Sequence, residues 1–170
     1  SLNTTAQSMA DESLKIGLLK YDKRHGYRGP IENNEENDWH KKFKSKTFPN
    51  NFLPAKIIQF DESEKVAIIE VLKNGKITIG KLSKYKWARE SLSNGYVGPK
   101  INKVTDVLKL NDIVLVALTD KQEFSLQQIP EINGGIVVMD PYTGRVIASS
   151  GGFDFKQSNF NRVYQAKRQP

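Results

Sequence analysis

The side chains with the richest chemistry near the N-terminus lie in the segment YDKRHGYRGP, Tyr21–Pro30. It brings together Asp22, Arg24, His25 and Arg28. Such a group can bind an anion or hold a base for proton transfer. A cluster of this kind, followed by Gly and Pro, also ends a helix and shapes the next turn. We favour this second interpretation because it is the commoner use of such clusters.

Other residue combinations that support catalysis are missing from the sequence. The chain has no Cys and only two His residues, His25 and His40, which excludes disulfides, thiol catalysis and Cys- or His-rich zinc sites. Ser149 and Ser150 have no nearby His to act as a base. The paired glycines are not followed by the Lys-Ser/Thr pattern of a phosphate-binding loop. We therefore expect no cofactor and no self-contained active site.

The positive charge is spread thinly, with one local exception. The net charge is +7, from 26 basic and 19 acidic residues. The stretch Lys73–Arg89 holds six basic residues, no acidic residue, and the aromatic residues Tyr85 and Trp87. This pattern is typical of single-strand binders, but we favour a solvated hairpin and helix face with two core aromatic residues. The candidate residues for binding a partner or a glycan are Lys81, Lys84, Lys86, Trp87 and Arg89.

The first half of the chain predicts one helix and a linker. Apolar residues recur at helical spacing from about Ala6 to Lys23, and Thr4–Gln7 has the pattern of a capping box. No second helix follows to cover the apolar stripe. Residues 31–53 are polar and charged with scattered aromatic residues, so we expect a linker with one helical turn around Asp38–Lys44.

From Leu53 to Pro130, short apolar segments alternate with turns. Asn74–Gly75 is a strong signal for a two-residue hairpin turn. After it, Ile77 and Ile79 alternate with polar residues, as in a half-buried strand. A short helix is expected at 83–91. Strands are predicted at 55–60, 66–72, 76–82, 113–118 and 123–129, which together favour a small OB-like barrel.

Pro130 marks a new start in the chain. Two further strands, at 135–140 and 145–150, are joined by the tight turn Pro141–Gly144. The predicted fold is therefore mainly β with a few helices: a small OB-like β-barrel inserted between an N-terminal helix and a C-terminal β-hairpin. The expected domains are 1–30 for the N-terminal flank, 31–130 for the inserted barrel and 131–170 for the C-terminal segment.

Four stretches of the sequence are distinctive. They are YDKRHGYRGP at Tyr21–Pro30, DVLKLNDIVLV at Asp106–Val116, LQQIPEINGGIVVMDPYTGRVIASSGGFDF at Leu126–Phe155, and SNFNRVYQAKRQP at Ser158–Pro170. In order and spacing they resemble the bifunctional, class A penicillin-binding proteins of bacteria over nearly the whole chain. The resemblance implies a glycosyltransferase that polymerises lipid II and a transpeptidase that crosslinks peptidoglycan, with an OB-like domain inserted near the start of the transpeptidase domain.

The resemblance also implies where the chemistry of the parent protein lies. In the family, the transpeptidase motif S-x-x-K follows QAKRQP after one Gly, so no catalytic residue is expected within this chain. Residues 1–30 and 131–170 would be pieces of an incomplete transpeptidase domain. We expect β-lactams to acylate the parent but not this fragment. The parent would be anchored in the inner membrane and act on its periplasmic side, although no run of about 20 apolar residues occurs here.

Three roles stay open for the barrel itself. The resemblance implies a non-catalytic docking or regulatory module for an outer-membrane lipoprotein activator or other cell-wall synthesis proteins. The second role is a single-stranded nucleic-acid binder that uses Lys73–Arg89, although the even spread of charge leads us to expect no nucleic acid. The third is a binder of glycan strands that uses an exposed Trp39 or Trp87.

Overall fold

The computed structural model describes residues 4–153, and the chain divides into two compact units. One unit comprises Lys23–Gln128, and the other combines Ser1–Asp22 with Ile129–Pro170. Residues 1–3 and 154–170 lie outside the described residues, and so does the distinctive stretch at Ser158–Pro170.

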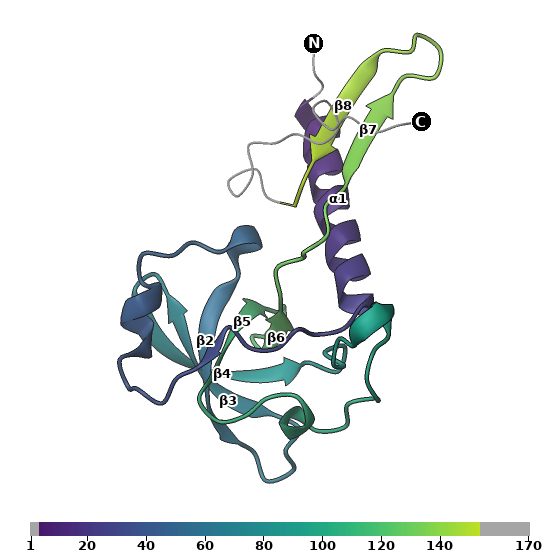
Figure 1. Cartoon of the computed structure of the whole chain (residues 1–170). Coiled ribbons are helices and arrows are strands. Elements are labelled where there is room, and N and C mark those ends of the chain that lie inside the picture. The colour runs from purple at the N-terminus through teal and green to yellow at the C-terminus, as the bar shows by residue number, and fades with distance from the viewer. Residues whose placement is uncertain (1–3, 154–170) are drawn as a thin grey trace. The chain divides into compact units, whose positions relative to one another are not determined.

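The larger unit is built around a closed β-barrel (Figure 1). Its strands are β2 (Leu53–Phe60), β3 (Ala67–Lys73), β4 (Lys76–Lys84), β5 (Asp112–Leu118) and β6 (Phe124–Gln127). They are ordered β5-β2-β3-β4-β6, and β6 pairs again with β5 to close the barrel. β4 and β6 run parallel, whereas the other barrel pairs are antiparallel. The predicted OB-like fold, mainly β, is therefore confirmed.

The turn between β3 and β4 forms as the sequence predicts. Lys73 and Lys76 are the last paired residues of the two strands, so Asn74 and Gly75 alone make the turn. Their φ angles are 51° and 75°. Positive φ at both central residues is typical of a type I′ turn, whose twist matches that of the flanking strands.

The inward face of β4 differs from the one that its apolar pattern favours. Leu82 is fully buried, whereas Ile79 is 64% exposed. Gly80 takes an inward position, where a Cβ atom would lie 2.4 Å from Cε2 of Phe124. The ring of Phe124, supplied by β6, thus fills the volume that a side chain on Gly80 would need. Because Phe124 is far from Gly80 in sequence, although β6 pairs directly with β4, alternation within β4 did not reveal this packing.

The helix predicted at 83–91 is wrong. β4 continues to Lys84, and the residues after it form turns and isolated bridges. Tyr85 and Ala88 are both buried, and their spacing of three positions resembles one face of a helix. The main chain of this segment pairs instead with the segment around Tyr27, which sequence periodicity does not report.

The segment before β2, residues 31–52, packs on the barrel and is not a loose linker; we call it the covering segment. Trp39 and Phe43 are 1% and 2% exposed. They form a second apolar cluster with Leu72 of β3 and Ile113 of β5. The predicted helical turn is confirmed as the 3-10 helix η1, Trp39–Phe43. The expectation that Trp39 offers an exposed ring to a glycan is therefore wrong.

Several short elements complete this unit. They are β1 (Glu32–Asn33), η2 (Pro49–Asn51), η3 (Ser93–Gly95) and η4 (Val104–Asp106). β1 pairs with the first residues of β5 and so anchors the start of the covering segment. η4 contributes the fully buried side chain of Val104 to the barrel core, and Leu108 follows it there.

The smaller unit contains α1 (Thr4–Arg24) as far as Asp22, and the antiparallel strands β7 (Gly135–Met139) and β8 (Val146–Gly151) (Figure 1). Gln7 joins the helix to β8. Its Nε2 donates to the main-chain oxygen of Ser149 at 2.7 Å, and its Oε1 accepts from the N–H of Ser149 at 3.2 Å. The side-chain amide of Gln7 thus acts like a neighbouring strand. No helix in the described part of the chain has the length and apolarity to cross a membrane.

Candidate functional site

The structure separates the five binding residues predicted from sequence into two groups. Lys81 and Lys84 lie on β4 and Lys86 in the turn after it, and all three side chains are exposed. Trp87 and Arg89 are half-buried. Of the five, the lysines are therefore the residues presented to solvent.

Trp87 is held by contacts within its own unit. Its Nε1–H donates to the main-chain oxygen of Leu126 at 3.0 Å. The edge of the indole meets the ring of Tyr27 at a centroid distance of 5.7 Å, and Lys23 Nζ lies 4.9 Å from the indole centroid. A half-buried ring with its N–H bonded and a lysine over its face has little surface left for stacking on a base or a sugar.

Arg89 also connects segments of the same unit. Its Nε–H donates to the main-chain oxygen of Gly98 at 2.6 Å. Its own main-chain oxygen accepts from the N–H of Tyr27 at 2.6 Å, and the N–H of Ser91 donates back to the oxygen of Tyr27 at 3.0 Å. These bonds explain why the segment after β4 is irregular and why the side chain of Arg89 is half-buried.

The exposed part of β4 forms a surface with β3, which we call the β3–β4 outer face. It consists of Ile68 and Glu70 on β3 with Ile79 and Lys81 on β4. Glu70 lies opposite Ile79, and Ile68 lies opposite Lys81. β3 and β4 are the second and third strands of the barrel, whose outer face is where OB-folds bind their ligands. An exposed isoleucine beside a lysine makes this face the candidate docking surface.

Part of the neighbouring surface is covered by the chain itself. Trp39 Nε1–H donates to Glu70 Oε2 at 2.9 Å. Trp39 and Phe43 pack over Leu72, and Ile77 packs against the same cluster. A single strand of nucleic acid needs a continuous track with exposed rings along this face. The covering segment interrupts that track, which disfavours the nucleic-acid interpretation.

A buried lysine helps to fix the covering segment. Lys56 of β2 is 4% exposed, and its Nζ donates to the main-chain oxygen of Glu36 at 3.0 Å. Lys56 lies opposite Glu70 of β3 in the sheet. This basic residue is structural, and nothing in the local sequence distinguishes it from the exposed lysines.

The segment YDKRHGYRGP shows the helix-ending role that we favoured. α1 ends at Arg24, and Gly26 follows with a φ of 90°. Asp22 is buried, and its carboxylate accepts a hydrogen bond from the N–H of Glu131 at 3.3 Å. Among residues 4–153, no three or more carboxylates and imidazoles come close enough together to hold a metal ion.

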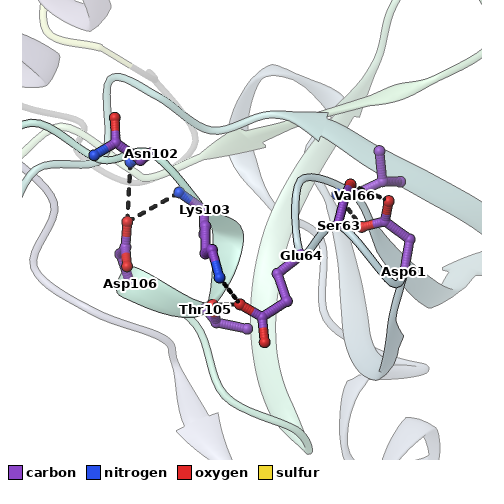
Figure 2. A network of polar contacts seen from close by, with 8 residues as sticks. All are labelled: Asp61, Ser63, Glu64, Val66, Asn102, Lys103, Thr105 and Asp106. Atoms are coloured by element: carbon purple, nitrogen blue, oxygen red, sulfur yellow. Dashed lines mark hydrogen bonds and ion pairs between the residues drawn. The ribbon is translucent and has the colours of Figure 1, made fainter.

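A polar network joins the β2–β3 turn to η4 (Figure 2). Lys103 Nζ lies 2.7 Å from Glu64 Oε2, and Thr105 Oγ1 donates to the same oxygen at 3.2 Å. The hydrogen bond from Lys103 is the main cause that lowers the pKa of Glu64, and the same contact raises the pKa of Lys103. Because both side chains are exposed, water and salt screen the pair and its contribution to stability is small.

Asp106 closes the other half of this network. Its Oδ2 accepts from the N–H groups of Asn102 and Lys103, each at 2.9 Å (Figure 2). Hydrogen bonds from these two main-chain N–H groups lower the pKa of the Asp106 carboxyl, and the bond from Lys103 has the largest effect. In the β2–β3 turn, Asp61 accepts from Ser63 and from the N–H of Val66. The network therefore shapes two turns at one end of the barrel.

A hollow that sequence reasoning missed lies at the β3–β4 turn. Its volume is about 630 Å³. Residues of the covering segment, the start of β2, the β3–β4 turn and the end of β5 line it. The lysines at its edge are Lys44, Lys46 and Lys73. Since they come from two separate segments, only the fold brings them together.

A family model described as the penicillin-binding protein OB-like domain matches residues 27–132. The chain belongs to this family. The match confirms the resemblance to penicillin-binding proteins that the four distinctive stretches indicated. It covers the barrel strands β2 to β6 and the covering segment.

The similarity of this penicillin-binding protein to curated relatives covers the whole chain and is not confined to the residues that the family model matches. Penicillin-binding protein 1A of Rickettsia typhi is 39% identical over 100% of this chain, which spans 20% of that protein. The protein of the same name from Pseudomonas aeruginosa is 34% identical, with 100% and 21% covered. That from Escherichia coli is 33% identical, with 99% and 20% covered. The chain thus spans about a fifth of the length of these relatives.

A solved structure shares the fold. The crystal structure of penicillin-binding protein 1A from Haemophilus influenzae matches with a TM-score of 0.64 and 26% sequence identity. The match covers 96% of this chain and 23% of that protein. The arrangement of the penicillin-binding protein OB-like domain is therefore found in a relative of known structure.

Proposed function

We propose that this chain is the non-catalytic, OB-like docking or regulatory module of a bifunctional peptidoglycan synthase, together with flanking pieces of its transpeptidase domain. The family match and the whole-chain similarity to penicillin-binding protein 1A support the parent's identity. In this proposal, residues 31–130 are the insert, and 1–30 and 131–170 are the flanks. The parent polymerises lipid II, crosslinks peptidoglycan and is acylated by β-lactams at the periplasmic side of the inner membrane.

One observation carries the docking role. Ile79, on the outer face of the barrel, is 64% exposed beside the lysine at position 81. Exposed apolar surface bordered by charged and polar residues is typical of protein interfaces. Lys84 and Lys86 extend the positive charge along the same stretch. The partner that we propose is a cell-envelope protein, such as an outer-membrane lipoprotein activator or another cell-wall synthesis protein.

Labelled penicillin tests the non-catalytic part of the proposal. The 170-residue chain is expected to form no covalent adduct with a fluorescent penicillin under conditions in which the parent protein is acylated. Stoichiometric acylation of the chain would place a reactive nucleophile within it and would overturn this part.

A photoreactive side chain at position 79 tests the docking part. The full-length parent carrying the probe at Ile79 is expected to crosslink to one envelope protein in growing cells. A probe at Lys65, exposed in the β2–β3 turn, is the matched control. The docking role is rejected if position 79 gives no adduct, or if positions 79 and 65 give the same adducts.

A further inference from the structure

The hollow at the β3–β4 turn has an apolar wall and a basic rim. Phe48 and Leu53 line it and are half-buried, and Leu118 at the end of β5 is 46% exposed. Lys44 and Lys46 come from the covering segment, and Lys73 comes from the end of β3. A concave, partly apolar surface with a few polar groups at its edge is the usual form of a small-ligand site.

The charge of the hollow is unbalanced. No Asp or Glu lines it. In the described part of the chain, Lys44, Lys46 and Lys73 form no ion pair with a carboxylate. Three exposed ammonium groups around one depression create a positive potential that attracts anions.

Two acidic residues of the covering segment, Glu32 and Asp38, are paired with lysines that do not line the hollow. Lys41 binds Asp38 at 2.7 Å, and Lys42 binds Glu32. The hydrogen bond from Lys42 is the main cause that lowers the pKa of Glu32, and the charge of Lys46 adds a smaller effect. These two carboxylates are thus matched by lysines outside the hollow.

The groups at the rim are held in place by the fold. Lys46 Nζ lies 5.1 Å from the ring centroid of Phe43, which is itself buried. Asn50 and Asn51 adopt φ angles of 55° and 56°, and the N–H of Phe52 closes this turn onto the oxygen of Pro49 at 3.1 Å. With Asn74 of the β3–β4 turn, these amides add neutral donors for carboxylate oxygens.

We propose that this hollow binds a short peptide that carries free carboxylates, as the stem peptides of peptidoglycan do. The inference rests on the proposed function, which brings the barrel close to that polymer. The three ammonium groups match several carboxylates on one short ligand, and the apolar wall accommodates its aliphatic parts. A volume of about 630 Å³ suits a few amino-acid residues. Phe43 and Phe52 are buried and Phe48 is half-buried, so none of the rings that line the hollow is fully exposed for the stacking that nucleic acids require.

Titration of the 170-residue chain with a disaccharide tetrapeptide from uncrosslinked peptidoglycan tests the inference. Saturable, salt-sensitive binding is expected by isothermal calorimetry. Lys46→Glu and Lys73→Glu are each expected to weaken binding at least about tenfold. Lys65→Glu, an equal charge change in the exposed β2–β3 turn outside the hollow, is expected to leave the affinity unchanged.

The ligand's own chemistry supplies the second comparison. Amidation of its carboxyl groups is expected to abolish binding. An all-L acidic peptide of matched charge distinguishes the two sources of carboxylates. If it binds as tightly as the stem peptide, the hollow takes acidic protein segments, which overturns the inference but leaves the docking proposal standing.

Two further outcomes would overturn the inference. These are the absence of binding by the unmodified stem peptide, and binding that is unchanged in both rim variants. Thermal melting of each variant establishes that it is folded, and Lys46→Gln and Lys73→Gln replace the charge reversals if those destabilise the barrel. Acylation of the 170-residue chain by penicillin is measured in the absence of the stem peptide. A failure of the proposed function is therefore detected independently of stem-peptide binding.

Discussion

The indole N–H of Trp87 donates a hydrogen bond to the main-chain oxygen of Leu126 at 3.0 Å. This bond ties the irregular segment after β4 to the end of β6. The contact of the indole with Tyr27 ties the same segment to the chain that follows α1. Trp87 is therefore a junction of three segments, and its first role is in stability.

Substitution of Trp87 separates this structural role from ligand binding. Trp87→Phe keeps a ring but loses the hydrogen bond to Leu126, so we expect a loss of about 1 kcal/mol in the free energy of unfolding. Trp87→Ala also removes the packing on Tyr27, and we expect a loss of about 3 kcal/mol. Urea unfolding followed by circular dichroism measures both values. Wild-type stability in the alanine variant would contradict the structural role.

Gly26 is required for the close approach of two chain segments. Its φ is 90°, and a Cβ atom there would lie 2.7 Å from the main-chain oxygen of Arg89. That oxygen accepts the hydrogen bond from Tyr27, so the clash and the broken bond add together. We expect Gly26→Ala to lower the free energy of unfolding by about 3 kcal/mol or more.

A matched glycine isolates the effect of the clash. Gly75 has a φ of 75°, but a Cβ atom at this position would have no neighbouring atom within 4 Å. Gly75→Ala is therefore expected to cost only about 1 kcal/mol, from backbone strain alone. Equal midpoints of urea unfolding for the two variants would show that the approach to Arg89 is not tight.

Local patterns predicted the strands of the barrel well. The hydrophobic run before Leu118 and the Asn74–Gly75 turn each carry a signal within a few residues. The prediction of a helix after β4 was wrong because the structure of this segment depends on hydrogen bonds to Tyr27, which is far away in sequence. The expectation that Trp39 is exposed was wrong because of its local sequence. Its neighbours are polar and charged, so their composition concealed a buried side chain.

One of the two candidate surfaces could be predicted from the local sequence, and the other could not. The exposure of Lys81 follows from the charge pattern of its segment. The basic hollow does not, because Lys46 precedes β2 and Lys73 ends β3, so they come together only when the covering segment packs on the barrel. Charge counting along the chain finds basic stretches, but it does not find basic rims that are assembled from separate segments.

Tyr85 offers a test of the cost of a buried hydroxyl. Its side chain is 1% exposed, and its hydroxyl makes no hydrogen bond within the described part of the chain. Burial is the main cause that raises the pKa of this hydroxyl. Removing an unpaired polar group from the interior avoids its desolvation cost, so Tyr85→Phe is expected to keep or raise stability by up to about 1 kcal/mol. A lower urea midpoint would show that the hydroxyl has a partner.

Asp106 makes stability depend on pH. Main-chain N–H groups of Lys103 and Asn102 lower the pKa of its carboxyl, so the ionised form is favoured in the folded state. This contribution is complete above the unfolded pKa of about 3.9 and is lost as the pH falls through the lower folded value. Asp106→Ala should therefore destabilise the chain at pH 7, and this effect should shrink as the pH falls from about 4 towards 2, as measured by urea unfolding across that range. Asp120→Ala, in the exposed β5–β6 turn where the carboxylate accepts no hydrogen bond from the described residues, is the matched control and should show a small difference at every pH. A difference between wild type and Asp106→Ala that stays constant from pH 7 to about pH 2 would mean that the carboxylate does not stabilise η4 through its charge.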